Sequence, residues 1–161
     1  MPTPKPVAQP PSAIRALTVR QPMAWAIMEG IKPIENRSQP TRYRGPLLIH
    51  SAVAPTDAAT LADGTPVPKR LVYGAILGSV TLVDCVELAA APSSPFASGP
   101  WCWILRDPKP IAPIPIAGQL GLWTPKLVLS CDHCRKTQPV AWGVQAVLCC
   151  KCGRRFPCEW E

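Results

Sequence analysis

The sequence is poor in charge and in histidine and has no long apolar run, and each shortage excludes a class of protein. Charged residues are only 17% of the 161 residues, so the chain is no polybasic tail and its basic side chains must act by their placement. No uninterrupted apolar stretch reaches the roughly 20 residues that span a bilayer, so we expect no membrane segment. With only two histidines, the chain offers few candidates for a catalytic site that depends on histidine.

The start of the chain also lacks the apolar core of a signal peptide. Residues 1–13 contain five prolines instead, which predicts a disordered Pro-rich tail. We therefore expect a cytoplasmic protein. Its net charge of +7 favours an acidic partner, and nucleic acid is the commonest such partner of a basic protein.

Short apolar segments predict one β-rich domain over residues 14–125. Branched and aromatic residues between turn signals indicate strands. These strands are expected at 14–20, 44–52, 71–86 and 101–105, and the segment 118–123 closes the domain. Prolines at every second or third position between 108 and 115 exclude a central strand there.

Two short helices are expected within this domain. The first covers 23–29, with Pro22 tolerated in the first turn and Gly30 placed to end it. The second covers 55–62, with Thr56 as its candidate N-cap. The sequence therefore predicts an α+β fold: a small, partly closed β-barrel with two short helices.

Six of the eight cysteines follow residue 126 and predict a separate zinc ribbon over 126–161. In a chain without an export signal, paired cysteines indicate metal binding rather than disulfides. The expected ligands of one Zn²⁺ are the two Cys-x-x-Cys pairs: Cys131, Cys134, Cys149 and Cys152. A site closed by four thiolates has no open position, so this zinc would be structural. We expect a hairpin over 138–148 and a third strand over 154–160.

Two alternatives to this cysteine site stay open. A redox-active Cys-x-x-Cys pair would need a βαβ context, which the sequence does not show. Cys158 is an alternative ligand, although a lone strand cysteine also serves as packing.

The segment between the first helix and the next apolar strand is expected to be a turn crowded with charge, and this turn marks the candidate site. Between residues 32 and 44 the segment contains one acidic residue, Glu35, and four basic residues: Lys32, Arg37, Arg42 and Arg44. Burying unpaired charge costs several kcal/mol, so we expect these residues to line a surface or cleft that meets an anion. Arginines suit phosphate because they form bidentate, charge-assisted hydrogen bonds. Alternatively, the lysine and the glutamate form a plain ion pair and the arginines a solvated rim.

Flanking residues extend this candidate site. Arg20 and Gln21 precede the first helix, whose exposed N–H groups favour an anion, or else they cap the helix. Six of the ten aromatic residues are tryptophan. Trp25 and Tyr43 could each stack a base, or else pack in the core.

The residues from Leu17 onward resemble the ASCH domain (activating signal cointegrator homology), a relative of the PUA domains of RNA-modifying proteins. The matching pattern is LTVRQP, a tryptophan-bearing helix, and G-x-K-x-x-E-N-R beginning at Gly30. The strand GPLLIHSA and the closing segment WCWILRDPKPI…PIPIAGQLGLW agree as well, so the resemblance covers about 15–125. It implies a PUA-like barrel with a cleft beside the first helix that binds RNA or nucleotides. The candidate contacts are Arg20, Gln21, Trp25, Lys32, Asn36, Arg37, Arg42, Tyr43 and Arg44.

The resemblance also implies a second, enzymatic hypothesis. Some family members deacetylate acetylated cytidine, with a lysine similar to Lys32, a threonine three residues on and a strand glutamate; others are reported to cut RNA. Here the position three after Lys32 is Glu35, and a carboxylate cannot replace a hydroxyl nucleophile. The strand carboxylate would be Asp84 or Glu87.

Three functions remain as hypotheses. The first is a nucleic-acid-binding protein, most of all for RNA or a nucleotide-like ligand, with a structural zinc ribbon. The second is a hydrolase acting on a modified nucleoside or RNA through Lys32 and Glu35. The third is a protein adaptor whose ribbon makes the contacts.

Overall fold

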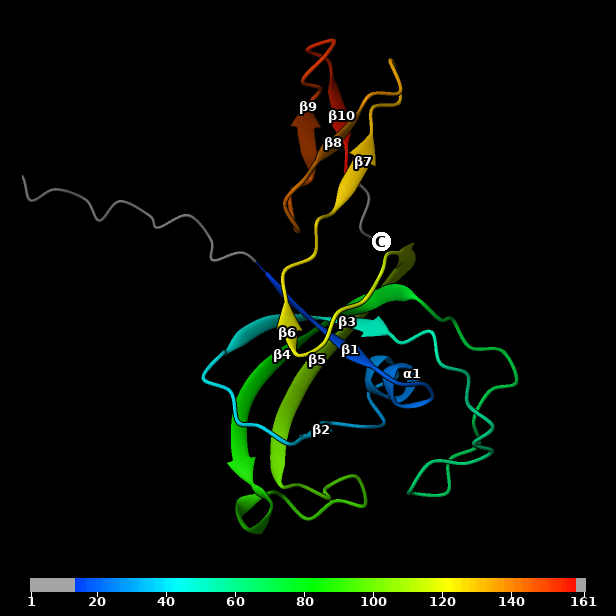
Figure 1. Ribbon diagram of the computed structural model, residues 1–161, viewed down its shortest axis with the longest axis vertical. Coiled ribbons are helices and arrows are strands. Elements are labelled where there is room, and N and C mark those ends of the chain that lie inside the picture. Colours follow the sequence, from blue (N-terminus) through cyan, green and yellow to red (C-terminus); the bar gives the residue numbers. More distant parts are fainter. Residues whose placement is uncertain (1–13, 159–161) are drawn as a thin grey trace, which may run out of the picture.

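The computed structural model describes residues 14–158, which form one curled sheet with a small cysteine-rich module beside it (Figure 1). Six strands make the sheet, in the order β2-β5-β4-β3-β1-β6. Their bounds are β1 Arg15–Val19, β2 Ile34–Arg37, β3 Gly45–Ser51, β4 Ala75–Glu87, β5 Trp101–Pro115 and β6 Leu122–Trp123. Strands β1 and β3 run parallel and the other neighbours antiparallel. The sheet curls into a half-barrel, which confirms a mostly β fold.

Helix α1 (Met23–Met28) covers one face of this sheet. Its Ala24, Ile27 and Met28 are buried in the main core together with side chains of β1, β3, β4 and β5. Gly30 follows with φ 73°, the left-handed conformation expected at the end of a helix. An isolated helix of this length is marginal, so its stability comes from this packing. No helix within residues 14–158 is both long and apolar enough to cross a membrane.

The second expected helix, at 55–62, is wrong. The segment is irregular, and Thr60 forms an isolated bridge with Pro66. Leu61 is its single buried residue, so a helix here would have no apolar face to pack. The Thr56 hydroxyl accepts the Ala58 N–H at 3.1 Å in a local turn instead of capping a helix. Within residues 14–158, α1 is accompanied only by a 3₁₀ turn, η1 (Leu88–Ala90).

Two strands differ from the expected bounds. Residues 34–37, expected as a turn, form the edge strand β2, and β5 continues past Leu105 to Pro115. Strand β2 pairs only with residues 101–104 of β5, so the proline-rich part beyond pairs with β4 alone. The prolines therefore lie on an open edge where their missing N–H groups break no ladder, consistent with their expected exclusion from a central strand.

Residues 126–158, called the cysteine module below, contain two hairpins. Strand β7 (Val128–Ser130) pairs with β8 (Thr137–Pro139), and β9 (Ala146–Leu148) pairs with β10 (Arg155–Pro157). Each Cys-x-x-Cys pair lies in the turn of its own hairpin, so the single hairpin expected between the pairs, over 138–148, is wrong. The physical reason is that each Cys-x-x-Cys segment itself forms the turn that reverses the chain.

The cysteine module packs on the barrel through a shared apolar cluster. Leu127, Val140 and Trp142 contact a group that includes Ala16 and Trp123 of the sheet. The domain boundary expected between residues 125 and 126 therefore separates two parts of the chain whose apolar side chains are in contact. The Pro-rich tail expected at 1–13 lies outside the described residues, as does the end of the strand expected at 154–160.

Candidate functional site

Lys32 and Glu35 form a buried ion pair at the start of β2. Lys32 Nζ lies 2.6 Å from Glu35 Oε2 and also donates to the Ile34 carbonyl. The residues are only 4% and 8% exposed. The Lys32 N–H donates to the carbonyl of Ala26 in α1 at 3.0 Å, and Glu35 is paired with Trp103 in the β2–β5 ladder. The backbone on both sides thus holds the pair in place.

Lys32 lines a cavity of about 260 Å³ between the end of α1 and the bend of β4 and β5, called the Lys32 cavity below. Its lining residues are Ile27, Gly30, Lys32, Pro33, Val80, Leu105, Arg106, Asp107 and Pro108. Arg106 and Asp107 are both exposed, and Asp107 has a left-handed φ of 53°. We did not predict these two residues from the sequence. The sequence feature that could have indicated them is the charged pair Arg-Asp that interrupts the apolar strand in WILRDPKP.

Arg37 connects the buried pair to the surface. Its guanidinium nitrogen is 4.0 Å from Glu35 Oε1, and its Cζ lies 5.9 Å from the centroid of the Trp103 ring. A cation over an aromatic face at this distance is attracted electrostatically. Lys32, Glu35 and Arg37 are therefore the predicted site residues that the fold brings together.

Asn36 and Gln21 have structural roles instead. Asn36 Oδ1 accepts the N–H groups of Ser98 and Gly99 at 2.9 and 3.0 Å, and Nδ2 donates to the Phe96 carbonyl at 2.7 Å. Gln21 Oε1 accepts the N–H of Trp25, and Nε2 donates to Val72. Their amides are occupied by the backbone, which leaves little for a ligand.

Replacing Asn36 by alanine should lower the free energy of unfolding by about 2 to 3 kcal/mol, because two loop N–H groups lose their acceptor. Urea denaturation measures this change. Asn36→Asp keeps the acceptor but replaces the donor to Phe96 with a carboxylate oxygen that repels this carbonyl, so it should also be less stable than wild type. Equal stability of all three proteins would contradict the role assigned to the amide.

The other predicted contacts lie apart from Lys32. Arg44 binds Asp84 at 3.0 Å and also donates to the carbonyls of Thr41 and Tyr43. The Tyr43 hydroxyl donates to the Pro46 carbonyl. Tyr43 and Arg44 line a different pocket, at the cysteine module, and not the Lys32 cavity. The single cleft predicted for the segment 32–44 is therefore divided into two hollows.

The remaining predicted site residues lie singly on the surface or in other contacts. Trp25 is half-buried and packs on a cluster with Leu61 and Phe96. Arg20 and Arg42 are exposed. Of the two proposed strand carboxylates, Asp84 binds Arg44 rather than Lys32, and Glu87 is exposed at the end of β4. The acid that meets Lys32 is Glu35.

The four predicted cysteine ligands converge in the cysteine module. All four sulfurs lie within 4.8 Å of one another, with Cys131 Sγ 3.8 Å from Cys152 Sγ and Cys134 Sγ 3.5 Å from Cys149 Sγ. Four thiolates at a metal–sulfur distance of about 2.3 Å in a tetrahedron are about 3.8 Å apart. The donor set and spacing are therefore compatible with a metal site.

The two Cys-x-x-Cys turns have the same backbone geometry. The N–H of Arg135 donates to the Cys131 carbonyl and that of Gly153 to the Cys149 carbonyl, both at 2.9 Å. Arg135 and Gly153 have matching left-handed φ angles of 60° and 70°. This agreement presents both thiol pairs to one point in the same way.

Backbone donors also prepare one thiol for ionisation. The N–H of Cys152, assisted by that of Lys151, donates to Cys149 Sγ and lowers the pKa of this thiol to about 6. Cys150 is exposed and outside the cluster, and Cys158 is buried outside it. Burial raises the pKa of the Cys158 thiol. Among the described residues, Cys158 therefore lies outside the cluster as a packing residue and is not an alternative ligand.

The sequence model of the ASCH domain matches residues 17–99, more than half of the chain. The chain belongs to the ASCH domain family. A related protein is activating signal cointegrator 1 from Homo sapiens, 27% identical over 124 residues that cover 66% of this chain and 21% of that protein. The chain thus spans about a fifth of the length of this relative.

Solved ASCH structures are more distant. The crystal structure of ASCH from Zymomonas mobilis is 19% identical with a TM-score of 0.41, and covers 64% of this chain and 73% of that one. A mutant of the same protein is 18% identical with a TM-score of 0.41, covering 65% and 76%. The family assignment rests on the sequence match and not on these structures. The ASCH match contains Lys32, Glu35 and Arg37, whereas Arg106, Asp107 and the cysteine module follow it.

Proposed function

We propose that this ASCH protein binds RNA, or a nucleotide-like ligand, in the Lys32 cavity. The observation that carries the proposal is a buried ammonium, held 2.6 Å from Glu35, in the wall of a cavity whose rim is open to solvent at Arg106. Such a preorganised, poorly hydrated donor interacts more strongly with an anion or a base oxygen than an exposed lysine does. The volume suits a single base or phosphate, because ordinary small-ligand pockets begin near 300 Å³.

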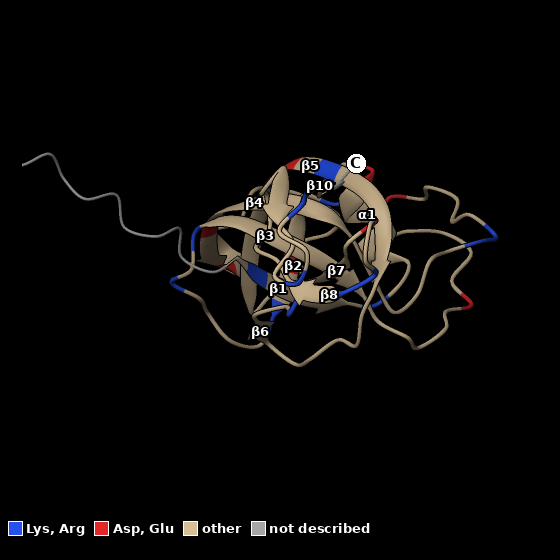
Figure 2. Ribbon diagram, turned by 90° about the horizontal axis from the view of Figure 1, so that it is seen from above, with Lys and Arg blue, Asp and Glu red and all other residues tan. Residues whose placement is uncertain are grey.

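Exposed cations supply the phosphate contacts in this proposal. Arg106 lies at the rim of the Lys32 cavity. Arg20 and Arg42, which precede and follow the Lys32–Glu35 pair in the sequence, are also exposed. Figure 2 shows Lys and Arg on β5 and on several loops, with fewer Asp and Glu. A surface of this kind tracks a phosphate backbone rather than one isolated anion.

We further propose that the four cysteines hold one structural Zn²⁺, as in a zinc ribbon. When bound, zinc would supply a cross-link between the two hairpins and perform no chemistry, since four thiolates leave it no open position. A reducing cytoplasm, expected from the sequence, keeps such thiolates available.

The salt dependence of binding tests the RNA proposal. The observed association constant for single-stranded RNA should fall log-linearly with salt, and Arg106→Ala should reduce the slope by about 0.7, the value of one phosphate on a single strand. Fluorescence anisotropy over a salt series measures the slope. Lys69→Ala is the matched control, because Lys69 is exposed and lines none of the described cavities. Affinity independent of salt would overturn the proposal.

A second candidate, a nucleoside or RNA hydrolase, is supported by the same buried Lys32–Glu35 pair. Incubation with acetylated cytidine and single-stranded RNA, followed by mass spectrometry, distinguishes the two. Turnover that Lys32→Arg abolishes while RNA affinity persists would favour the hydrolase. Intact RNA that is bound with salt-sensitive affinity would favour the binding protein.

A further inference from the structure

The wall of the Lys32 cavity contains polar groups of both signs that other described residues leave unoccupied. The Lys32 ammonium has three N–H donors. Two of them bind the Ile34 carbonyl and Glu35, so one remains on a side chain that lines the cavity. Arg106 and Asp107 also line it, and neither side chain forms an ion pair or hydrogen bond with another of the residues 14–158.

A β-bulge brings Asp107 to this cavity. At the bulge one residue of β4, Val80, lies opposite two residues of β5, Asp107 and Pro108, and all three line the cavity. Asp107 has a left-handed φ of 53°, which aspartate tolerates but which is uncommon outside glycine. Bulges are frequent beside functional sites because they redirect a side chain that regular pairing would place elsewhere. The irregular point of β5 therefore coincides with the wall of the candidate site.

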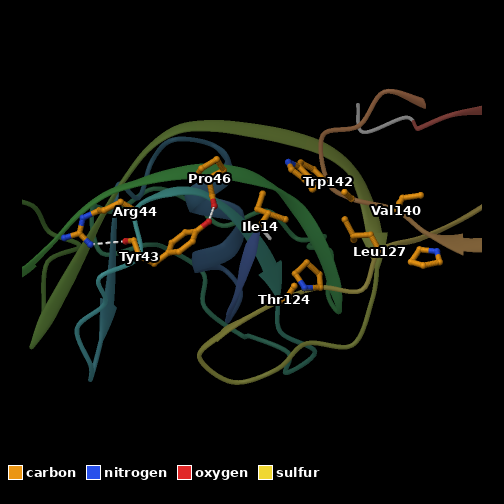
Figure 3. A pocket seen from close by; sticks show the side chains of 11 residues that line it. Ile14, Tyr43, Arg44, Pro46, Thr124, Leu127, Val140 and Trp142 are labelled. Atoms are coloured by element: carbon orange, nitrogen blue, oxygen red, sulfur yellow. Dashed lines mark hydrogen bonds between the residues drawn. The ribbon is translucent and has the colours of Figure 1, made fainter. Parts of the chain in front are cut away.

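The larger pocket at the cysteine module, with a volume of about 630 Å³, differs in this respect (Figure 3). Its Tyr43 hydroxyl donates to the Pro46 carbonyl, and its Arg44 binds Asp84 at 3.0 Å. These polar side chains already bind other groups of the protein. The Lys32 cavity, although smaller, therefore offers more to orient a polar ligand.

The mixture of charges favours a base over a phosphate inside the Lys32 cavity. A carboxylate in the wall repels a phosphate, whereas a base presents hydrogen-bond donors and acceptors side by side. The apolar side chains of Ile27, Val80 and Leu105 complete the wall and suit the faces of a planar ring. Arg106 at the rim remains the contact for the phosphate outside.

We propose that the Lys32 cavity selects guanine, with Asp107 accepting hydrogen bonds from N1–H and N2–H and Lys32 donating to O6 or N7. This inference rests on the proposed RNA-binding function and names the base that is bound. Guanine presents N1–H and N2–H side by side, so both carboxylate oxygens find a donor. Its O6 and N7 are acceptors for the ammonium.

The other bases fit this pair of side chains less well. In adenine and cytosine the amino group lies beside a ring nitrogen that only accepts hydrogen bonds, and in uracil the N3–H lies between two carbonyls. A carboxylate that binds the donor with both oxygens therefore meets a lone pair in each of these bases. Asp107 is thus the residue that determines specificity, and Lys32 binds an acceptor that every base can offer.

The test measures the affinity of the full chain for oligouridylates of about five nucleotides whose central residue is guanosine, adenosine, cytidine or uridine. Fluorescence anisotropy should show that the RNA with guanosine binds about 5- to 100-fold more tightly than the others, the discrimination that one bidentate contact supplies. Asp107→Asn keeps the size and tolerates the left-handed φ, but it replaces one acceptor oxygen with a donor, so the preference should be lost. Asp107→Gly, which removes the carboxylate and accepts this φ without strain, should lose it as well.

Asp57→Asn is the matched control, because Asp57 is exposed and lines none of the described cavities, so the guanosine preference should persist in it. A preference that persists in Asp107→Asn or Asp107→Gly would remove the carboxylate from the site and overturn the inference. Equal affinity of the wild type for all four RNAs, or preference for another base, would overturn it while the RNA-binding function stands. Failure of the wild type to bind any of them would instead overturn the proposed function, and the inference with it.

Discussion

Removing the proposed zinc ion from the protein should unfold the cysteine module and leave the barrel folded. The module has short hairpins, each with three-residue strands, and its own buried cluster centres on Cys131, Cys149 and Phe156. So small a core cannot offset the conformational entropy of the segment without a cross-link. Structural zinc contributes about 10 to 16 kcal/mol in comparable peptides at neutral pH, which is the largest effect we expect in this protein.

Calorimetry with and without a chelator, and titration of released zinc, measure this effect. Two adjacent cysteines provide a matched pair of variants. Cys149→Ser removes a sulfur of the cluster and should reproduce the chelated state, whereas Cys150→Ser changes an exposed neighbour and should behave as wild type. The barrel transition should persist at a lower temperature, because Leu127, Val140 and Trp142 no longer cover their cluster. A single merged transition would contradict the division into two modules.

Replacing Lys32 by alanine should destabilise the barrel by about 3 to 5 kcal/mol, the usual effect of leaving one partner of a buried ion pair uncompensated. Glu35 would stay buried, with Arg37 at 4.0 Å as its nearest cation among the described residues. The cavity vacated by the lysine stem adds to the loss. Urea denaturation measures the change, with Lys69→Ala as the exposed control.

A double substitution separates stability from function. Lys32→Met together with Glu35→Gln removes both charges at nearly constant volume, so it should recover most of the stability that Lys32→Ala loses. It should not recover RNA affinity, because the donor in the cavity wall is gone. Stability in Lys32→Ala equal to wild type would show that the pair is solvated. Full RNA affinity in the double variant would remove Lys32 from the site.

The cysteine cluster shows what local sequence can predict. A spacing of two residues confines both thiolates of a pair to one turn, whatever surrounds it, so the four clustered cysteines could be read directly from the chain. The first helix is a similar case, since Gly30 ends it by local geometry. Its length and packing agree with the expectation because three apolar residues share one face.

The wrong predictions concern segments whose structure depends on distant partners. The helix expected at 55–62 has good local signals, but only Leu61 finds a core to enter. The charged segment after Gly30 was expected as a turn, but residues 34–37 form a strand because their backbone pairs with Trp103 and its neighbours in β5. Pairing with a strand that lies far along the chain cannot be read from the segment itself.

The sequence by itself determined the mostly β fold, the ASCH pattern and the set of cysteines, because each depends on periodicity or on spacing within a few residues. The tertiary structure decided which charges are free. It buries Lys32 against Glu35, binds Arg44 to Asp84, and leaves Arg106 exposed at the rim of a cavity. It also brings Trp142 to the barrel, because packing of the cysteine module on the sheet creates the pocket between them.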